Sequence, residues 1–172
     1  MAMTGRALGG QHREQDRLPG LAQQPGRART RSRAPDPGRD RRPDYVVSRA
    51  AEVLNLQSKS VRGSRVLVVG VAYKANIADL RESPAVDVLT PLRRAGADMS
   101  YADPHVPGPV EMEGGPLCGV QLSPDVVEAQ DLVVITTAHD SFDWAVVREH
   151  ARTVLDTRGW GQGKQLANWH TI

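Results

Sequence analysis

Two runs of consecutive apolar residues constrain the fold of this 172-residue chain more than any other feature. The first lies within Arg65–Gly70 and the second within Asp131–Thr136. Neither run alternates polar with apolar residues, as a strand exposed on one face would. An unbroken apolar strand is covered on both faces, which is typical of a parallel sheet between two layers of helices.

Helix and turn signals separate these runs. Ser83-Pro84 and Ser123-Pro124 each place a capping serine before a proline at the first helical position, and Gly96 suits a left-handed helix end. We predict helices over 44–56, 83–94, 123–129 and 143–151, and further strands over 97–101, 120–122 and 153–156. This alternation predicts an α/β fold, a Rossmann-like parallel sheet with helices on both faces.

The first 43 residues have a different composition from the rest. They contain ten arginines and four acidic residues, but no aromatic residue and no Val, Ile or Phe. Such a segment cannot bury enough apolar surface to offset the entropy lost on ordering its backbone. We therefore predict a disordered tail over residues 1–43. The remaining residues carry more acidic than basic side chains, so the basic pI of 9.0 reflects the tail.

Several classes of protein are disfavoured by what the sequence lacks. Cys118 is the single cysteine, so no intrachain disulfide is possible, and this fits a reducing cytoplasm. His105 and His139 have no partner at the spacing of metal ligands, so we predict no metal site. No run of apolar residues approaches the length of about 18 residues that a membrane-spanning helix needs. We expect a cytoplasmic protein without membrane attachment.

The loop after the first strand holds the strongest candidates for chemistry, because ligands of open α/β sheets bind beyond the carboxyl ends of the strands. Gly70 does not begin a G-x-G-x-x-G dinucleotide motif; twelve residues separate it from the next helix. That loop carries Lys74 and Arg81, a point charge and a two-pronged donor that suit phosphate groups. For Asp79 we expect a structural role, as the partner of Arg81 or as a helix cap.

Four ordered blocks of sequence resemble the C-terminal domain of the UDP-glucose/GDP-mannose dehydrogenase family. The family signature reads approximately G-x-[AS]-[FY]-K-x-x-x-x-D-x-R-x-S-P, and residues 70–84 read GVAYKANIADLRESP. The other blocks are YADPHVP at 101–107, VVITTAH at 133–139 and VLDTR at 154–158. Residues 43–49 resemble the end of the long helix that joins the family's two domains. The resemblance covers about residues 43–163.

The resemblance implies a division of the chain and a function. Residues 1–43 are the tail, either genuine or misassigned through a shifted frame or start. Residues 44–60 are the remnant of the linker helix, and residues 61–172 form the nucleotide-sugar-binding C-terminal domain. The family oxidises the C6 alcohol of a UDP-sugar to a carboxylate with NAD. Within the family, the sequence most resembles bacterial enzymes that oxidise UDP-N-acetylhexosamines for surface polysaccharide.

The resemblance also implies roles for individual residues. Tyr73 and Lys74 stand where the family contacts the UDP-sugar, and so does Arg158. Arg81 stands where an arginine reaches NAD across the cleft between the domains. The chain has neither the NAD fingerprint nor the family's catalytic-cysteine segment, and Cys118 does not match the nucleophile. We therefore assign no catalytic residue and expect the chain by itself to be inactive.

Two alternatives belong to other functional classes. The chain could be a non-catalytic partner that docks onto an intact dehydrogenase through the helix at 44–56, or it could form a homo-oligomer. It could also associate with nucleic acid through the arginine-rich tail. The tail lacks aromatic residues for stacking on bases and the rest of the chain is acidic, so binding to nucleic acid is disfavoured.

Overall fold

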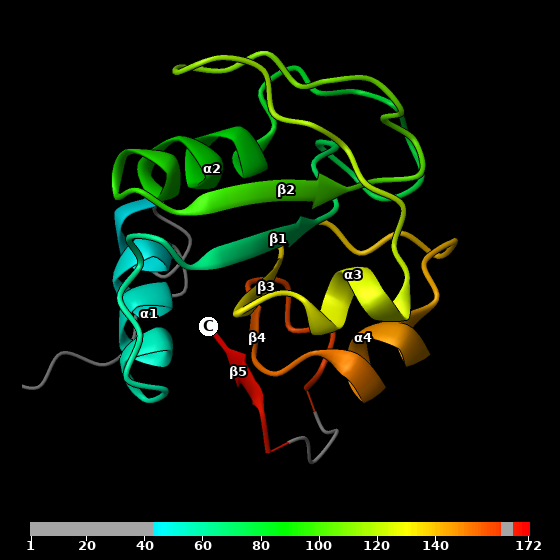
Figure 1. The fold of residues 1–172 in the computed structure, drawn as a ribbon. Coiled ribbons are helices and arrows are strands. Elements are labelled where there is room, and N and C mark those ends of the chain that lie inside the picture. Colours follow the sequence, from blue (N-terminus) through cyan, green and yellow to red (C-terminus); the bar gives the residue numbers. More distant parts are fainter. Residues whose placement is uncertain (1–42, 163–166) are drawn as a thin grey trace, which may run out of the picture. The chain divides into compact units, whose positions relative to one another are not determined.

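The computed structural model describes residues 43–162 and 167–172, which include five parallel strands in the order β2-β1-β3-β4-β5. The predicted tail at 1–43 lies outside the described residues, except for Pro43. The strands are β1 (Arg65–Val69), β2 (Asp98–Ala102), β3 (Leu132–Ile135), β4 (Val154–Asp156) and β5 (Trp169–Thr171). The helices are α1 (Pro43–Asn55), α2 (Pro84–Arg94), α3 (Pro124–Glu128) and α4 (Trp144–His150) (Figure 1).

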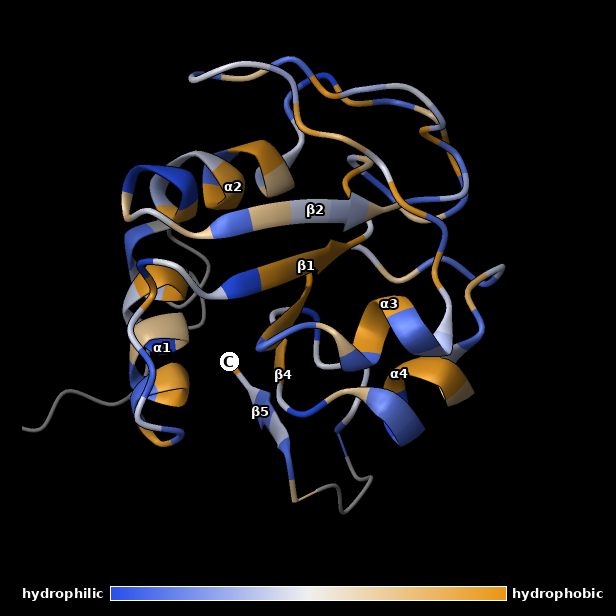
Figure 2. Ribbon diagram, in the orientation of Figure 1, coloured by the Kyte–Doolittle hydropathy of each residue, from blue (hydrophilic) through white to orange (hydrophobic). Residues whose placement is uncertain are grey.

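Helices cover both faces of the sheet, which confirms the predicted α/β architecture. Val66 and Val68 of β1 pack in one apolar cluster with α1 and α2. Leu67 and Val69 of the same strand pack in a second cluster with side chains of α3 and α4. Successive side chains of a strand point to opposite faces, so a strand with two covered faces must be apolar throughout. Figure 2 shows β1 as hydrophobic along nearly all its length after Arg65.

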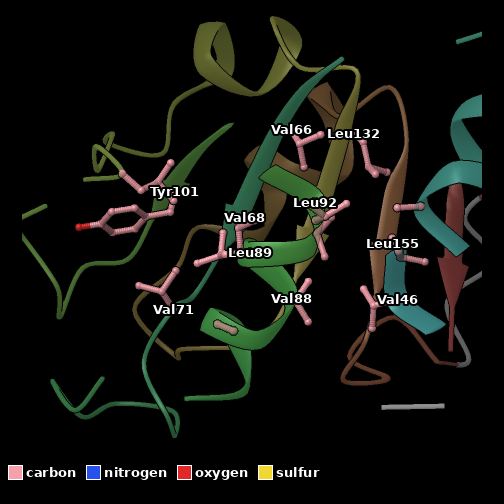
Figure 3. Packing of buried hydrophobic residues seen from close by; sticks show 14 of the residues in the cluster. Val46, Val66, Val68, Val71, Val88, Leu89, Leu92, Tyr101, Leu132 and Leu155 are labelled. Atoms are coloured by element: carbon pink, nitrogen blue, oxygen red, sulfur yellow. The ribbon is translucent and has the colours of Figure 1, made fainter. Parts of the chain in front are cut away.

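The first cluster is the larger of the two and fixes the helices that precede and follow β1. Val88, Leu89 and Leu92 of α2 point toward β1 and β3, and Val46 of α1 lies near Val88 (Figure 3). All these side chains are at most 5% exposed. Burying a side chain of this size contributes about 1.5–3 kcal/mol, so this packing rather than helix propensity holds α1 and α2 in place.

The helix ends follow the signals in the sequence. Ser83 accepts a hydrogen bond from the Ala85 amide at 3.2 Å, with Pro84 in the first helical position. Ser123 accepts from the Val126 amide at 3.4 Å in the same way. Gly96 follows α2 with a φ of +89°, the left-handed conformation that glycine adopts at least cost.

Two predictions about strands need correction. The strand predicted over 120–122 is wrong: this segment has only the isolated bridge of neighbouring Gly119 to Tyr101. Its apolar residues, Val120 and Leu122, instead pack as partly buried side chains against the second cluster. Strand β5 was not predicted. It has three residues, and its pairing of Trp169 with Val154 is set by tertiary contact rather than by any apolar pattern.

The described helices range from 5 to 13 residues. Within residues 43–162 and 167–172, none combines the length and apolar character needed to cross a bilayer.

Candidate functional site

The carboxyl ends of all five strands lie at one edge of the sheet because the strands are parallel. Figure 1 shows long loops gathered on the side to which the arrowheads of β1 and β2 point. The loop after β1 reaches from Gly70 to Ser83, and the loop after β4 begins at Thr157. These loops carry every residue for which the sequence predicted a ligand contact. Ligands of parallel α/β sheets bind at this edge.

The loop after β1 has a buried neck and an exposed tip. Val71 and Ala72 are fully buried, whereas Tyr73 is 39% exposed and Lys74 is exposed. The Tyr73 amide donates a hydrogen bond to the Asp79 carbonyl at 2.7 Å, which closes residues 73–79 into a short loop. The Lys74 Nζ lies 5.1 Å from the centre of the Tyr73 ring, within the range of a cation–π contact. The aromatic residue and the cation therefore project together.

The second cation of this loop has a protein partner. Arg81 donates from Nε and one Nη to the two carboxylate oxygens of Asp79, at 3.0 and 2.9 Å. The Arg81 hydrogen bonds hold the pKa of Asp79 down at about 2, and Asp79 raises the pKa of Arg81. The structural role expected for Asp79 is thus confirmed. The Arg81 side chain is 89% exposed, and its contact with NAD stays a prediction.

A buried carboxylate shapes the loop that presents Arg158. Asp156, fully buried at the end of β4, accepts from the Arg158 amide at 2.9 Å with one oxygen. The other oxygen accepts from the Gly161 amide at 2.7 Å and from the Trp169 indole at 3.2 Å. These bonds fold the chain tightly around Asp156. The exposed Arg158 side chain is consequently presented at the edge of the sheet by a turn with fixed backbone.

A cavity of about 230 Å³ lies beside this turn. Arg158 lines it together with Thr136, Thr157 and the first turn of α2. Val46 and Val88, both labelled in Figure 3, add apolar surface. Six residues line the cavity in all: Val46, Pro84, Val88, Thr136, Thr157 and Arg158. It therefore combines a cation with the amino terminus of a helix, both of which attract a phosphate group.

Tyr73, Lys74 and Arg81 do not line this cavity. The structure therefore places one of the predicted site residues, Arg158, at the hollow and leaves the other three on the neighbouring exposed loop. The contribution of Val46 was not foreseen, because it comes from α1, far from the loops in sequence. The signal in the sequence was the apolar face of that helix, which indicates burial but not the neighbour that it meets.

A larger cavity of about 460 Å³ opens at the end of β2. It is lined by Tyr101, Ala102, Asp103, Pro104, Val106, Pro107, Gly119, Val120, Gln121, Leu122, Ser141, Phe142 and Asp143. The charged residues in this lining are acidic, so it is the poorer host for a diphosphate. The described residues contain no group of three or more His, Cys, Asp or Glu placed to hold a metal ion.

Comparison with known proteins identifies the family of the chain. The model of the UDP-glucose/GDP-mannose dehydrogenase family, UDP binding domain, matches residues 67–162. The NDP-N-acetyl-D-galactosaminuronic acid dehydrogenase of Ralstonia solanacearum is 30% identical over 131 residues, 74% of this chain and 29% of that protein. The UDP-N-acetyl-D-mannosamine dehydrogenase of Salmonella typhimurium is 32% identical over 147 residues, 81% of this chain and 34% of that protein.

Solved structures agree with the fold. The UDP-D-ManNAc dehydrogenase of Pyrococcus horikoshii superposes with a TM-score of 0.61 at 22% identity, over 76% of this chain and 30% of that one. The present chain thus spans about 30% of the length of these three relatives. The match of the family model to residues 67–162 begins within β1 and includes the loop with Lys74 and the turn with Arg158. The chain belongs to the UDP-glucose/GDP-mannose dehydrogenase family, and residues 67–162 are its UDP binding domain.

Proposed function

We propose that this sheet edge binds the UDP part of a nucleotide sugar. The bound sugar would be a UDP-hexose or UDP-N-acetylhexosamine whose C6 alcohol is oxidised to a uronic acid in polysaccharide biosynthesis. The relatives from Ralstonia and Salmonella are dehydrogenases of N-acetylated sugars linked to nucleotides, which favours the N-acetylhexosamine. In this proposal the chain supplies substrate binding.

The cavity beside Arg158 carries this proposal. A diphosphate there would meet the guanidinium group of Arg158, which can donate two parallel hydrogen bonds to phosphate oxygens. It would also meet the positive end of α2. Thr136 and Thr157 already donate to main-chain carbonyls of Gly70 and Ile135. Their hydroxyl protons are therefore engaged within the protein, so these side chains shape the cavity and leave Arg158 as the donor to a phosphate.

We assign Tyr73 and Lys74 to the part of the ligand that extends outside the cavity. They follow β1, and Thr136 of the cavity follows β3, the neighbour of β1 in the sheet. Both side chains are exposed, and Lys74 has no ion-pair partner among the described residues. An exposed ring with an ammonium group over it suits a ligand that carries both a planar base or sugar face and negative charge.

We include NAD in the proposed function because the dehydrogenases of this family depend on it. The turn after β1 does not fit a dinucleotide cradle, because twelve residues rather than a short glycine-rich turn follow Gly70. The residue that we assign to NAD is Arg81. Its exposed guanidinium would contact a cofactor that is bound outside this domain. NAD would accept the hydride when bound, and this chain would hold the substrate.

The remaining assignments follow from the same proposal. Residues 44–60, of which α1 covers the greater part, would be the remnant of the helix that links two domains. The catalytic partner domain or an intact dehydrogenase would be the partner, with self-association as an alternative. A cytoplasmic location stays a prediction.

Calorimetric titration of the full chain with UDP tests the proposal. We expect Arg158→Ala to weaken UDP binding roughly 10- to 100-fold, since hydrogen bonds to charged groups are worth about 1.5–3 kcal/mol. Arg152→Ala is a matched control: Arg152 is exposed and lies just before β4, whereas Arg158 lies just after it. The control should bind UDP like the wild type.

Thermal unfolding gives an independent measurement. At a UDP concentration 100-fold above Kd, binding stabilises the folded state by about 2.7 kcal/mol, which raises the Tm of a domain of this size by roughly 10 °C. An unchanged Tm at millimolar UDP, or equal losses of affinity in Arg158→Ala and Arg152→Ala, would rule out binding at this cavity.

A further inference from the structure

We propose that Asp103 and His139 are positioning residues that hold the segment carrying Tyr73 and Lys74 in its ligand-binding shape. This inference rests on the proposed function, in which Lys74 contacts the nucleotide sugar. Asp103 follows β2 and His139 follows β3, so neither belongs to the loop that they hold. Their sequence separation of 36 residues hides the pair from any reading of local motifs.

Asp103 holds the first flank of the segment. Its Oδ2 accepts hydrogen bonds from the amides of Val71 and Ala72, at 2.7 and 3.0 Å. Thr137 donates from Oγ1 to the Ala72 carbonyl at 2.7 Å. The side chain of Asp103 is fully buried, so these bonds form away from competing water. Both the amides and a carbonyl group of the backbone just before Tyr73 are consequently held by buried side chains.

His139 holds the second flank. Its Nδ1 accepts from the Asn76 amide at 2.8 Å, and its Nε2 lies 3.0 Å from the same Asp103 Oδ2. An amide can only donate and a carboxylate only accepts, so the bound tautomer carries its proton on Nε2. The ring is fully buried in this arrangement. A single carboxylate oxygen is thereby connected to residues 71, 72 and 76, on both sides of the Tyr73–Lys74 pair.

A second clamp reinforces the flank at Asn76. Its side chain donates to the Asp140 carboxylate at 2.7 Å and accepts from the Asp140 amide at 3.0 Å. Asn76 has a φ of +64°, a left-handed conformation that asparagine tolerates better than most residues. The backbone is thus held by hydrogen bonds both before and after the Tyr73–Lys74 pair. Binding a ligand to a tip that is already ordered costs less entropy than ordering it on binding.

The chemistry of the pair predicts which replacements of His139 preserve binding. Asparagine places a carbonyl oxygen near the Nδ1 position and can still accept from the Asn76 amide. Glutamine reaches toward Asp103 but offers no acceptor at the δ position, and leucine removes both bonds. We therefore expect UDP-N-acetylglucosamine affinity to remain within about 3-fold of the wild type in His139→Asn, and to fall further in His139→Gln and His139→Leu.

A double-mutant cycle on the full chain tests whether His139 acts through Lys74. The affinity for UDP-N-acetylglucosamine is measured by calorimetry in the wild type, Lys74→Ala, His139→Leu and the double variant. We expect Lys74→Ala to weaken binding about 10-fold, and His139→Leu to weaken it several-fold. In the Lys74→Ala background, His139→Leu should cause a smaller loss than in the wild type, because one of the two groups that it positions is gone.

A general loss of stability would behave differently. Val147→Ala, a buried truncation on α4 away from the pair, is the matched control for reduced stability and should leave the affinity unchanged. Equal losses from His139→Leu in both backgrounds, or binding by His139→Asn no better than by His139→Gln, would overturn the inference. If Lys74→Ala binds normally, the role of Lys74 and this inference both fail, while Arg158→Ala still reports separately on the cavity.

Discussion

Replacement of Gly70 by alanine tests how the sheet edge is built. Gly70 directly follows β1 and begins the loop that carries Lys74, and its φ is +79°. A Cβ atom at this position would lie 2.0 Å from the Thr137 carbonyl oxygen and 2.7 Å from the carbonyl carbon. Both are backbone atoms of the segment that follows β3. The added methyl group must therefore push the ends of two adjacent strands apart.

Gly63 provides the matched control. Its φ of +78° is nearly the same, but a Cβ atom there would meet nothing within 4 Å. The left-handed conformation costs an L-residue about 1–2 kcal/mol, partly offset by about 0.4–1 kcal/mol from the stiffer unfolded chain. We expect Gly63→Ala to cost about 1 kcal/mol. Gly70→Ala adds overpacking of about 1–3 kcal/mol, for a total near 3 kcal/mol.

Urea unfolding followed by fluorescence of the three tryptophans measures both variants. With an m-value of about 1.5 kcal/mol/M, the expected difference of about 2 kcal/mol separates the two midpoints by about 1.3 M. Equal m-values in the two variants are needed for this comparison. A separation below about 0.5 kcal/mol would show that the contact between Gly70 and Thr137 does not constrain this edge of the sheet.

Two further predictions concern carboxylates. Burial raises the pKa of Asp131, but the Lys59 ammonium and the Arg65 amide outweigh this and leave it below the ordinary 3.8. A carboxylate with a lowered pKa stabilises the folded state above pH 3.8, and this stabilisation is lost as the pH falls further. We expect Asp131→Asn to reduce the free energy of unfolding in urea by about 1–2 kcal/mol at pH 7, and by less at pH 3. Asp79 should titrate near pH 2 by carboxyl NMR because of Arg81, and Arg81→Ala should return its midpoint toward 3.8; an unchanged midpoint would exclude the ion pair.

The parts of the fold that local chemistry determines were predictable from the sequence. The unbroken apolar runs at Val66–Val69 and Leu132–Ile135 indicated strands covered on both faces, and the serine–proline pairs marked the starts of α2 and α3. The pairing of Asp79 with Arg81 was also predictable, because a single residue separates them. In each case the interacting groups are close in sequence.

The parts set by distant contacts were not predictable. The connection between Asp103 and His139 was not foreseen, because it exists only once β2 and β3 flank β1. Likewise, Val46 reaches the cavity beside Arg158 only through the packing of α1. Strand β5 has no apolar run, since it is an edge strand whose side chains are only partly buried.

The isolated bridge beside β2 bears on how the sheet meets other chains. An open outer strand presents unpaired amides and carbonyls that can template the addition of a foreign strand. Here the Val120 amide donates to the Tyr101 carbonyl at 2.7 Å, and the Tyr101 amide donates to the Cys118 carbonyl at 3.3 Å. At the opposite margin, β5 offers only three residues. The outer side of Tyr101 is thus closed to a foreign strand, and β5 gives such a strand only a short edge to pair with.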